Sequence, residues 1–285
     1  MNRNYFIPVV LLLALGSLLA CSSEDDTSAL GGQPLVLYAG MPMTRSTIDS
    51  QWTEGDKVAV QIGSEVKQYE ITDTSTRLLE ASAGVEPFKW TSITDAFDVT
   101  AWSLGGTYQA TVPNNITIPS DQSGGYDRYD LLYAKGTLTP SNTDLTFYHQ
   151  MARVIVQLEF KTAVEPNNVV SVYLGYDHDA EGNLIDIVPL TGKFSAPTGN
   201  DNYGTWENFS NYPKGRVTMF HDATAEDGLS ATFSALLIPK DYSGTRFICI
   251  DTHTNLGLFY FVPSDGEADL QSGRTYTYRI TVNNE

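Results

Sequence analysis

Apolar and polar residues alternate along several stretches of the chain. The clearest stretches are 154–160, which reads Val-Ile-Val-Gln-Leu-Glu-Phe, and 275–282, which reads Thr-Tyr-Thr-Tyr-Arg-Ile-Thr-Val. A period of two residues is that of a β-strand with one buried face. Shorter or less regular apolar runs predict further strands at 35–39, 57–62, 66–71, 97–102, 129–134, 145–149, 169–176, 184–190, 216–220, 230–238, 246–251 and 256–262.

Clusters of turn-forming residues separate these runs, as at 54–56 (Glu-Gly-Asp) and 181–183 (Glu-Gly-Asn). Gly, Asn and Asp are the residues that tight turns favour. No window longer than about ten residues keeps the period of an α-helix. The pattern therefore predicts an all-β protein built from antiparallel β-sandwiches, with too many strands for a single sandwich of about seven.

The first residues have the pattern of an export signal. Arg3 precedes an apolar run that ends at Ala20, and Cys21 follows at once. A basic start, a short apolar run and a small residue before the cut are typical of a secretory signal peptide. Leu18-Leu19-Ala20-Cys21 resembles the bacterial lipobox, which implies cleavage between Ala20 and Cys21 and palmitate-type acylation of Cys21. An ordinary signal peptide with an incidental cysteine is the alternative.

This pattern gives the expected domain organisation. Residues 1–20 form the signal peptide, and 21–34, which are small and acidic with no apolar period, form a flexible tether. Glu165-Pro166-Asn167-Asn168 interrupts two strong strands, so we expect a break there. The expected domains are an N-terminal β-sandwich at 35–163 and a C-terminal β-sandwich at 164–285.

Charge and cysteine content narrow the range of partners. The net charge is −17, and loss of the signal peptide removes one more positive charge, that of Arg3. An acidic surface repels nucleic acid, so no nucleic-acid partner is expected. If Cys21 is acylated, Cys249 is the other cysteine and has no partner for a disulfide within the chain. The folded core must then stabilise this exported protein.

The sequence offers little catalytic or metal-binding chemistry. The four histidines are scattered singly, and no nucleophile elbow, phosphate loop or dinucleotide motif occurs. The stretch 177–183 begins like a calcium loop, but Val188 stands where the bidentate Glu belongs, so a solvated hairpin is the favoured interpretation. We therefore expect no enzyme activity, no metal and no cofactor.

One loop is unusually aromatic. Tyr203, Trp206, Phe209 and Tyr212 recur every three residues among polar turn residues. Such rings could present flat faces to a host glycan or a partner protein, since Tyr and Trp give much contact area for few rotatable bonds. The alternative is that they fold back and cap the sandwich.

Three segments occur together in an order found in one protein family. They are 43–60, with Met-Thr-Arg-Ser-Thr and Trp-Thr-Glu-Gly-Asp-Lys-Val; 145–156, with Leu-Thr-Phe-Tyr-His-Gln-Met-Ala-Arg-Val; and 273–282, with Gly-Arg-Thr-Tyr-Thr-Tyr-Arg. From about Leu35 onward the chain resembles the fimbrillin-like (minor-fimbria-type) lipoproteins of the Bacteroidetes. Ser22, Ser23, Glu24, Asp25 and Asp26 also resemble the tag that sends lipoproteins of that phylum to the outer face of the outer membrane.

The resemblance implies two transthyretin-like β-sandwiches, built into a surface pilus after export as a lipoprotein. It implies that an Arg-specific protease cuts between Arg45 and Ser46, which releases the lipid anchor and the strand near Leu35–Ala39. A strand from the next subunit then fills the groove. The implied location is the outer membrane and the fimbrium, with other fimbrial subunits as partners and a role in adhesion.

Only Asn283, Asn284 and Glu285 follow Val282, although stalk subunits of that family carry a donor strand. A tip or accessory subunit is therefore the favoured interpretation. The alternative from another class is a permanently membrane-tethered module that binds a glycan or host protein and never polymerises.

Overall fold

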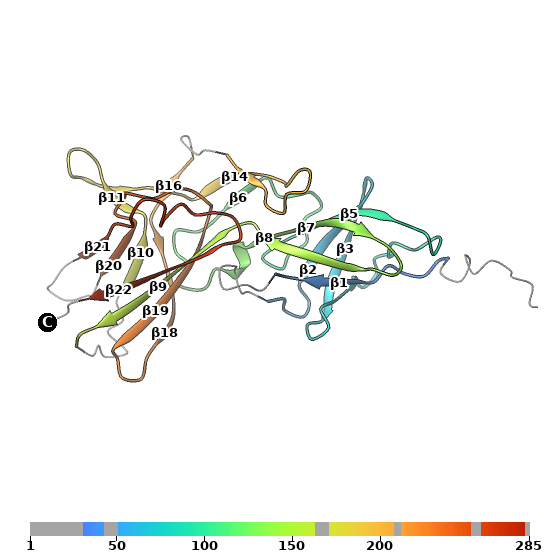
Figure 1. The fold of residues 1–285 in the computed structure, drawn as a ribbon, viewed down its shortest axis with the longest axis horizontal. Coiled ribbons are helices and arrows are strands. Elements are labelled where there is room, and N and C mark those ends of the chain that lie inside the picture. The colour runs from blue at the N-terminus through green and yellow to red at the C-terminus, as the bar shows by residue number, and fades with distance from the viewer. Residues whose placement is uncertain (1–30, 43–50, 163–170, 208–211, 252–257, 283–285) are drawn as a thin grey trace, which may run out of the picture.

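The computed structural model describes residues 31–42, 51–162, 171–207, 212–251 and 258–282 (Figure 1). In this part of the chain the regular structure is β-strand, apart from one 3₁₀ turn at Asp127–Tyr129. The prediction of an all-β fold is confirmed. None of the described segments forms a helix that is long and apolar enough to cross a membrane.

Seven strands from the first half of the chain close into one continuous sheet. Their order around the closed sheet is β1-β4-β3-β2-β5-β7-β8, and β8 pairs with β1 to complete it. All neighbours are antiparallel except β1 and β8, which run parallel. The strands are β1 (Leu37–Gly40), β2 (Lys57–Ile62), β3 (Glu65–Asp73), β4 (Leu78–Ala81), β5 (Phe97–Leu104), β7 (Leu131–Leu138) and β8 (Asp144–His149).

Two four-stranded sheets form the larger part of the second half. One has the order β18-β19-β9-β22 and the other β17-β10-β20-β21. β22 runs parallel to β9 along its whole length, from Thr275 opposite Arg153 to Val282 opposite Phe160. The strands are β9 (Ala152–Phe160), β10 (Ser171–Leu174), β17 (Val217–Thr218), β18 (Phe220–Thr224), β19 (Ser230–Leu237), β20 (Ile248–Asp251), β21 (Leu258–Phe261) and β22 (Thr275–Val282).

Short strands join the two regions. β14 lies between β6 and β15, so a strand from the first half pairs with the second half. Two further pairs are the hairpin β11-β12 and the pair β13-β16. The strands are β6 (Asn115–Thr117), β11 (Tyr176–His178), β12 (Leu184–Asp186), β13 (Val188–Pro189), β14 (Thr191–Ser195), β15 (Thr205–Trp206) and β16 (Lys214–Gly215).

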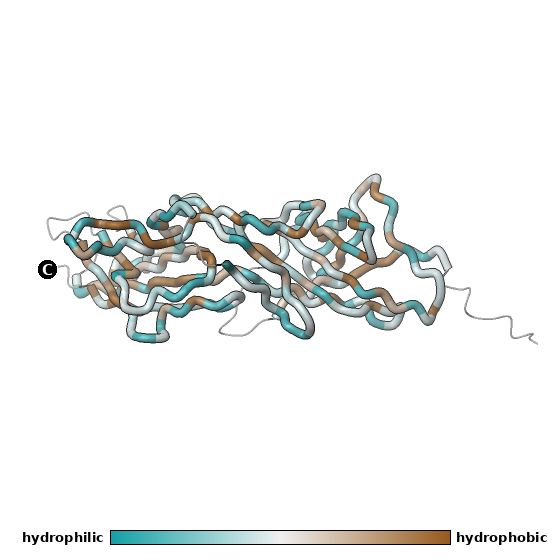
Figure 2. The backbone as a smooth tube through the Cα atoms, turned by 90° about the horizontal axis from the view of Figure 1, so that it is seen from above, coloured by the Kyte–Doolittle hydropathy of each residue, from teal (hydrophilic) through white to brown (hydrophobic). Residues whose placement is uncertain are grey.

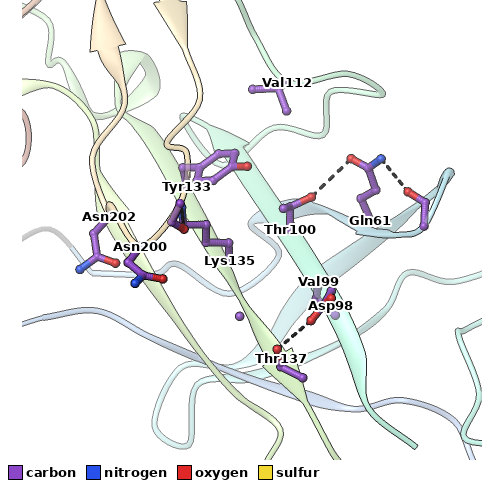
Figure 3. Close-up of a pocket in the computed structure, with 13 residues that line it drawn as sticks. Gln61, Asp98, Val99, Thr100, Val112, Tyr133, Lys135, Thr137, Asn200 and Asn202 are labelled. Carbon is purple, nitrogen blue, oxygen red and sulfur yellow. Dashed lines mark hydrogen bonds between the residues drawn. The ribbon is translucent and has the colours of Figure 1, made fainter.

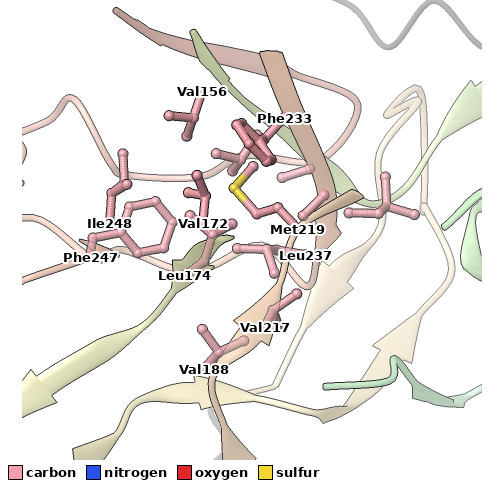
Figure 4. Close-up of a cluster of buried hydrophobic side chains, with 14 of the residues drawn as sticks. Val156, Val172, Leu174, Val188, Val217, Met219, Phe233, Leu237, Phe247 and Ile248 are labelled. Atoms are coloured by element: carbon pink, nitrogen blue, oxygen red, sulfur yellow. The ribbon is translucent and has the colours of Figure 1, made fainter. Parts of the chain in front are cut away.

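The buried apolar residues form two principal clusters. The larger lies between the two four-stranded sheets, where Val156 and Phe233 face Val172 and Ile248 (Figure 4). The smaller fills the closed sheet and includes Val60, Tyr69, Ile71, Val99 and Phe147. Apolar positions recur along the strands of both regions, which lie end to end in an elongated molecule (Figure 2). Burial of these residues is the main favourable contribution to folding.

Phe147 is the last residue of the smaller cluster, and from Met151 onward the buried apolar residues of the two principal clusters all belong to the larger one, to which Ile116, Ile118, Tyr126 and Leu131 also contribute. β9, at 152–160, already belongs to a sheet of the second half, and it precedes the break that the sequence suggested at 165–168. The short connection from β8 to β9 carries no proline or glycine, so no local signal marks the change. The division into domains at 35–163 and 164–285 stays a prediction.

Candidate functional site

The segment 32–40 lies between two other parts of the closed sheet. Leu35 donates its backbone N–H to the Phe88 carbonyl oxygen at 2.7 Å, and the Gln33 carbonyl oxygen accepts from the Trp90 N–H at 3.0 Å. β1 then pairs antiparallel with β4 on one side and parallel with β8 on the other. This segment is therefore the only link between β4 and β8 in the described part of the chain.

Side chains of this segment alternate between the core and the solvent. Leu35, Leu37 and Ala39 are completely buried, while Tyr38 is 39% exposed. This is the pattern that the run at 35–39 predicted, with one face in the apolar interior. Burial of each Leu contributes about 1.5–3 kcal/mol. Loss of the segment would thus open both a row of backbone groups and an apolar trench.

Tyr69 supports the same segment from inside the closed sheet. Its side chain is fully buried, and its hydroxyl oxygen accepts the Phe88 backbone N–H at 3.1 Å. Phe88 is also the residue whose carbonyl accepts from Leu35. Burial raises the pKa of Tyr69 to about 12, so the hydroxyl stays neutral at physiological pH. Tyr69 therefore helps to hold the backbone that pairs with the first strand.

Trp52 closes one end of the smaller cluster. Its indole N–H donates to the Ala39 carbonyl oxygen at 3.0 Å, and its ring meets Phe147 edge-on at 5.1 Å. The turn that follows contains Gly55, with φ of 89°, and Asp56, which accepts the Thr53 backbone N–H at 2.8 Å. Burial is the main cause that raises the pKa of Asp56. The turn leads directly into β2, as the sequence predicted.

Several predicted site residues lie outside the described residues. They are Ala20 and Cys21, the acidic tag Ser22, Ser23, Glu24, Asp25 and Asp26, the processing site Arg45 and Ser46, and Phe209. In the sequence Arg45 follows the end of β1 by five residues and precedes Trp52 by seven. A cut after Arg45 would therefore leave Trp52 in the retained chain and its acceptor, Ala39, in the released segment.

The aromatic residues of the 203–212 loop do not form one shared surface in the described structure. Trp206 donates its indole N–H to the Gln150 carbonyl oxygen at 3.0 Å, and its ring lies 5.2 Å from that of Phe194. Trp206 and Tyr212 both pack against the larger cluster. Tyr203 is 36% exposed and packs edge-on against Tyr148. The packing of Trp206 and Tyr212 favours the capping interpretation of this loop.

One buried polar pair had no signal in the sequence. His149 Nδ1 and Asp130 Oδ2 are 2.5 Å apart, and the two side chains are 1% and 9% exposed. They come from β8 and from the residue before β7, nineteen positions apart. His149 thus packs next to a carboxylate, at the end of β8 where the chain passes to β9.

The stretch 177–183 forms the hairpin between β11 and β12. Asp179 accepts hydrogen bonds from the Asn183 backbone and side chain, and from the Glu181 backbone. These bonds hold the pKa of Asp179 below its usual value. The hairpin interpretation is confirmed. Within the described residues, no group of three or more His, Cys, Asp or Glu side chains is placed to hold a metal ion.

A sequence profile of the fimbrillin-like family matches residues 44–285. The chain belongs to the fimbrillin-like family. The match begins after β1 and includes Arg45 and Trp52. A search of curated proteins found no match to this chain.

Solved structures with a similar fold support the same architecture. A candidate cell adhesion protein of Bacteroides uniformis superposes with a TM-score of 0.56 at 15% identity, covering 88% of this chain and 93% of its own. A candidate cell adhesion protein of Bacteroides ovatus gives a TM-score of 0.56 at 17% identity, covering 89% and 94%. At these identities the likeness shows the fold of this fimbrillin-like chain.

Proposed function

We propose that this fimbrillin-like protein is a non-enzymatic surface lipoprotein that becomes a fimbrial subunit by strand exchange. In this proposal Cys21 carries the lipid anchor at the outer membrane, and Ser22–Asp26 direct the protein to the cell surface. A protease then cuts between Arg45 and Ser46. The first strand leaves, and a strand of another fimbrial subunit takes its place.

The observation that carries the proposal is the position of β1. It is joined to its neighbours by backbone pairing on both sides, and Leu35, Leu37 and Ala39 fill the core beneath it. An incoming strand with the same alternation could satisfy the same backbone groups and fill the same trench. After the cut, no covalent bond within the chain would keep β1 in place.

We also propose that the protein is a tip or accessory subunit of the fibre, because β22 is not suited to act as a donor strand. This strand is paired with β9 along eight residues, and Tyr278 and Val282 are buried. To act as a donor it would have to give up this ladder and uncover the larger cluster. We therefore propose that the subunit accepts a strand and does not donate β22, and that it serves adhesion at the end or side of a fibre.

The test is assembly in solution. The soluble precursor, starting at Ser22, is treated with an Arg-specific protease, and a synthetic peptide with the sequence of residues 31–42 is added in excess to half of the sample. We expect the cut protein to enter oligomers that resist SDS at room temperature when other fimbrial subunits from the same cells are added as strand donors, and the peptide to suppress them. The variant Arg45→Ala should remain monomeric. Cut protein that stays monomeric with β1 displaced, or oligomers that form equally with Arg45→Ala, would contradict the proposal.

A further inference from the structure

A polar groove of about 840 Å³ lies on the outer face of the closed sheet (Figure 3). Its floor is formed by β2, β5 and β7, and one wall is the loop at 199–202, which follows β14. The groove thus joins residues that are far apart in the chain. Its volume is within the range of pockets that hold small ligands, roughly 300–1,000 Å³.

The register of the three strands explains why this face is polar. Residues that face outward alternate along each strand, and paired residues lie side by side across the sheet. The first cross-strand row is apolar and buried, and only Tyr133 of this row reaches the groove. The next two rows are polar and line the groove. The three rows are Ala59–Trp102–Tyr133, Gln61–Thr100–Lys135 and Asp98–Thr137.

Hydrogen bonds fix the wall of the groove. Lys135 donates from Nζ to the Gly199 carbonyl oxygen at 2.9 Å, and Gln150 donates from Nε2 to the Asn202 carbonyl oxygen at 3.1 Å. Gln150 is completely buried, and its side-chain oxygen accepts the Gly204 backbone N–H at 2.8 Å. Because these bonds are made to backbone atoms of the loop, they fix the loop without using its side chains. The exposed side chains of Asn200 and Asn202 make no hydrogen bond to the described residues and remain available.

The lining presents neutral hydrogen-bonding groups with little charge. The Asn200 and Asn202 amides each offer donors and an acceptor, and Thr137 adds a hydroxyl oxygen. Gln61 already donates to the Gly63 carbonyl oxygen at 3.0 Å and accepts from the Thr100 hydroxyl at 3.4 Å, so these two side chains offer their remaining N–H and lone pairs. The Lys135 ammonium group already binds the loop, and Asp98 accepts from Thr137 at 2.7 Å. Val112 and Tyr133 add apolar surface at one end, as Figure 3 shows.

A peptide strand does not suit this floor. β5 is paired with β2 on one side and with β7 on the other, so its backbone has no unpaired edge at the groove. Amides and hydroxyls around a small apolar surface are instead suited to a ligand with many hydroxyl groups and an apolar C–H face. We propose that this groove is a binding site for a neutral oligosaccharide.

The inference is independent of strand exchange. β1 lies between β4 and β8, and neither β1 nor β4 lines the groove. A failure of assembly would therefore leave sugar binding intact, and a failure of sugar binding would leave assembly intact.

The test uses the soluble protein starting at Ser22 and an array of immobilised neutral and acidic oligosaccharides of two to six units. The neutral oligosaccharide that gives the strongest signal is then titrated in solution by calorimetry. The test variant is Asn200→Ala with Asn202→Ala. The matched control is Asn114→Ala with Asn115→Ala, two exposed asparagines that do not line the groove. Thermal unfolding tests whether both double variants are folded.

We expect a neutral oligosaccharide to bind, with at least about a tenfold loss of affinity in Asn200→Ala/Asn202→Ala, since two ligand hydrogen bonds are lost. The control variant should bind within about twofold of the original protein. No binding to any neutral oligosaccharide, binding to acidic ones only, or equal affinity in the two double variants would overturn the inference.

Discussion

Trp52 holds the carbonyl oxygen of Ala39 by an indole hydrogen bond of 3.0 Å. In the sequence Arg45 stands between these two residues. The bond therefore joins the two sides of the proposed cut. After the proposed cut, this bond would let the protein keep its first strand until an incoming strand competed for the same place.

Replacement of Trp52 should weaken this connection. Trp52→Phe keeps an aromatic ring against Phe147 but leaves the buried Ala39 carbonyl without its donor. We expect the free energy of unfolding to fall by about 1–3 kcal/mol, and the peptide ending at Arg45 to leave the cut protein faster. Chemical denaturation and peptide release followed by size-exclusion chromatography measure the two effects.

Trp90→Phe is the matched control. Trp90 is also buried in the smaller cluster, and its ring stacks on Phe97 at 5.0 Å. Its backbone, and not its indole, pairs with the first segment. Peptide release that is as fast in Trp90→Phe as in Trp52→Phe would show that the indole hydrogen bond does not hold the strand.

Substitutions at inward and outward positions of β1 should have very different effects on the free energy of unfolding. Leu37 is completely buried and Tyr38, its neighbour, is 39% exposed. Leu37→Ala should lower the free energy of unfolding by about 2–5 kcal/mol, because it removes transfer energy and leaves a cavity. Tyr38→Ala should cost less than about 1 kcal/mol. Urea unfolding of the uncut protein gives both values, and similar losses in the two variants would contradict the position of the strand.

Asp56 should make stability depend on pH in a defined direction. Its pKa is raised in the folded state, mainly by burial, so the folded protein binds the proton more tightly than the unfolded chain. Asp56 then lowers stability as pH rises through its folded pKa, and the effect disappears below its unfolded pKa. Asp56→Asn keeps an acceptor for Thr53 and removes the charge.

We therefore expect Asp56→Asn to be more stable than the original protein at pH 7. The difference should shrink as pH falls from the raised folded pKa toward about 4, and vanish well below pH 4, where Asp56 is protonated in both states. Urea unfolding at pH 7 and at acidic pH measures the difference. A gap that stays constant with pH would mean that ionisation of Asp56 does not matter to stability.

The buried pair of Asp130 and His149 should be sensitive to loss of one partner. Asp130→Ala leaves the buried His149 Nδ1 without its 2.5 Å partner, which should cost about 1–3 kcal/mol or more. Asp130→Asn keeps an oxygen that can accept from Nδ1 and should cost less. Unfolding curves of the two variants give the comparison, and equal losses would show that the hydrogen bond contributes little.

The sequence predicts the strands with a full period of two, such as β9 and β22, because one face of each is buried along its length. It does not predict β4, β6 or β14, which are short and hold their place through partners. β14, for example, reads Thr-Gly-Lys-Phe-Ser and pairs with β6 on one side and β15 on the other. Tertiary pairing overrides local pattern at such positions.

Long-range relations are likewise absent from the sequence pattern. The first strand was expected, and its burial follows from the alternation at Leu35, Leu37 and Ala39. Its parallel pairing with β8 was not expected, because a period of two does not encode strand direction. The groove joins β2, β5 and β7 with the 199–202 loop, and no motif links segments so far apart.

The N-terminal residue of the protein recovered from the cell surface tests the central claim most directly. Mass spectrometry of the terminal peptide, from both the monomer and the SDS-resistant fraction, identifies it. Strand exchange after processing predicts a chain in the resistant fraction that begins at Ser46. A lipidated Cys21 as the only terminus in both fractions would contradict it.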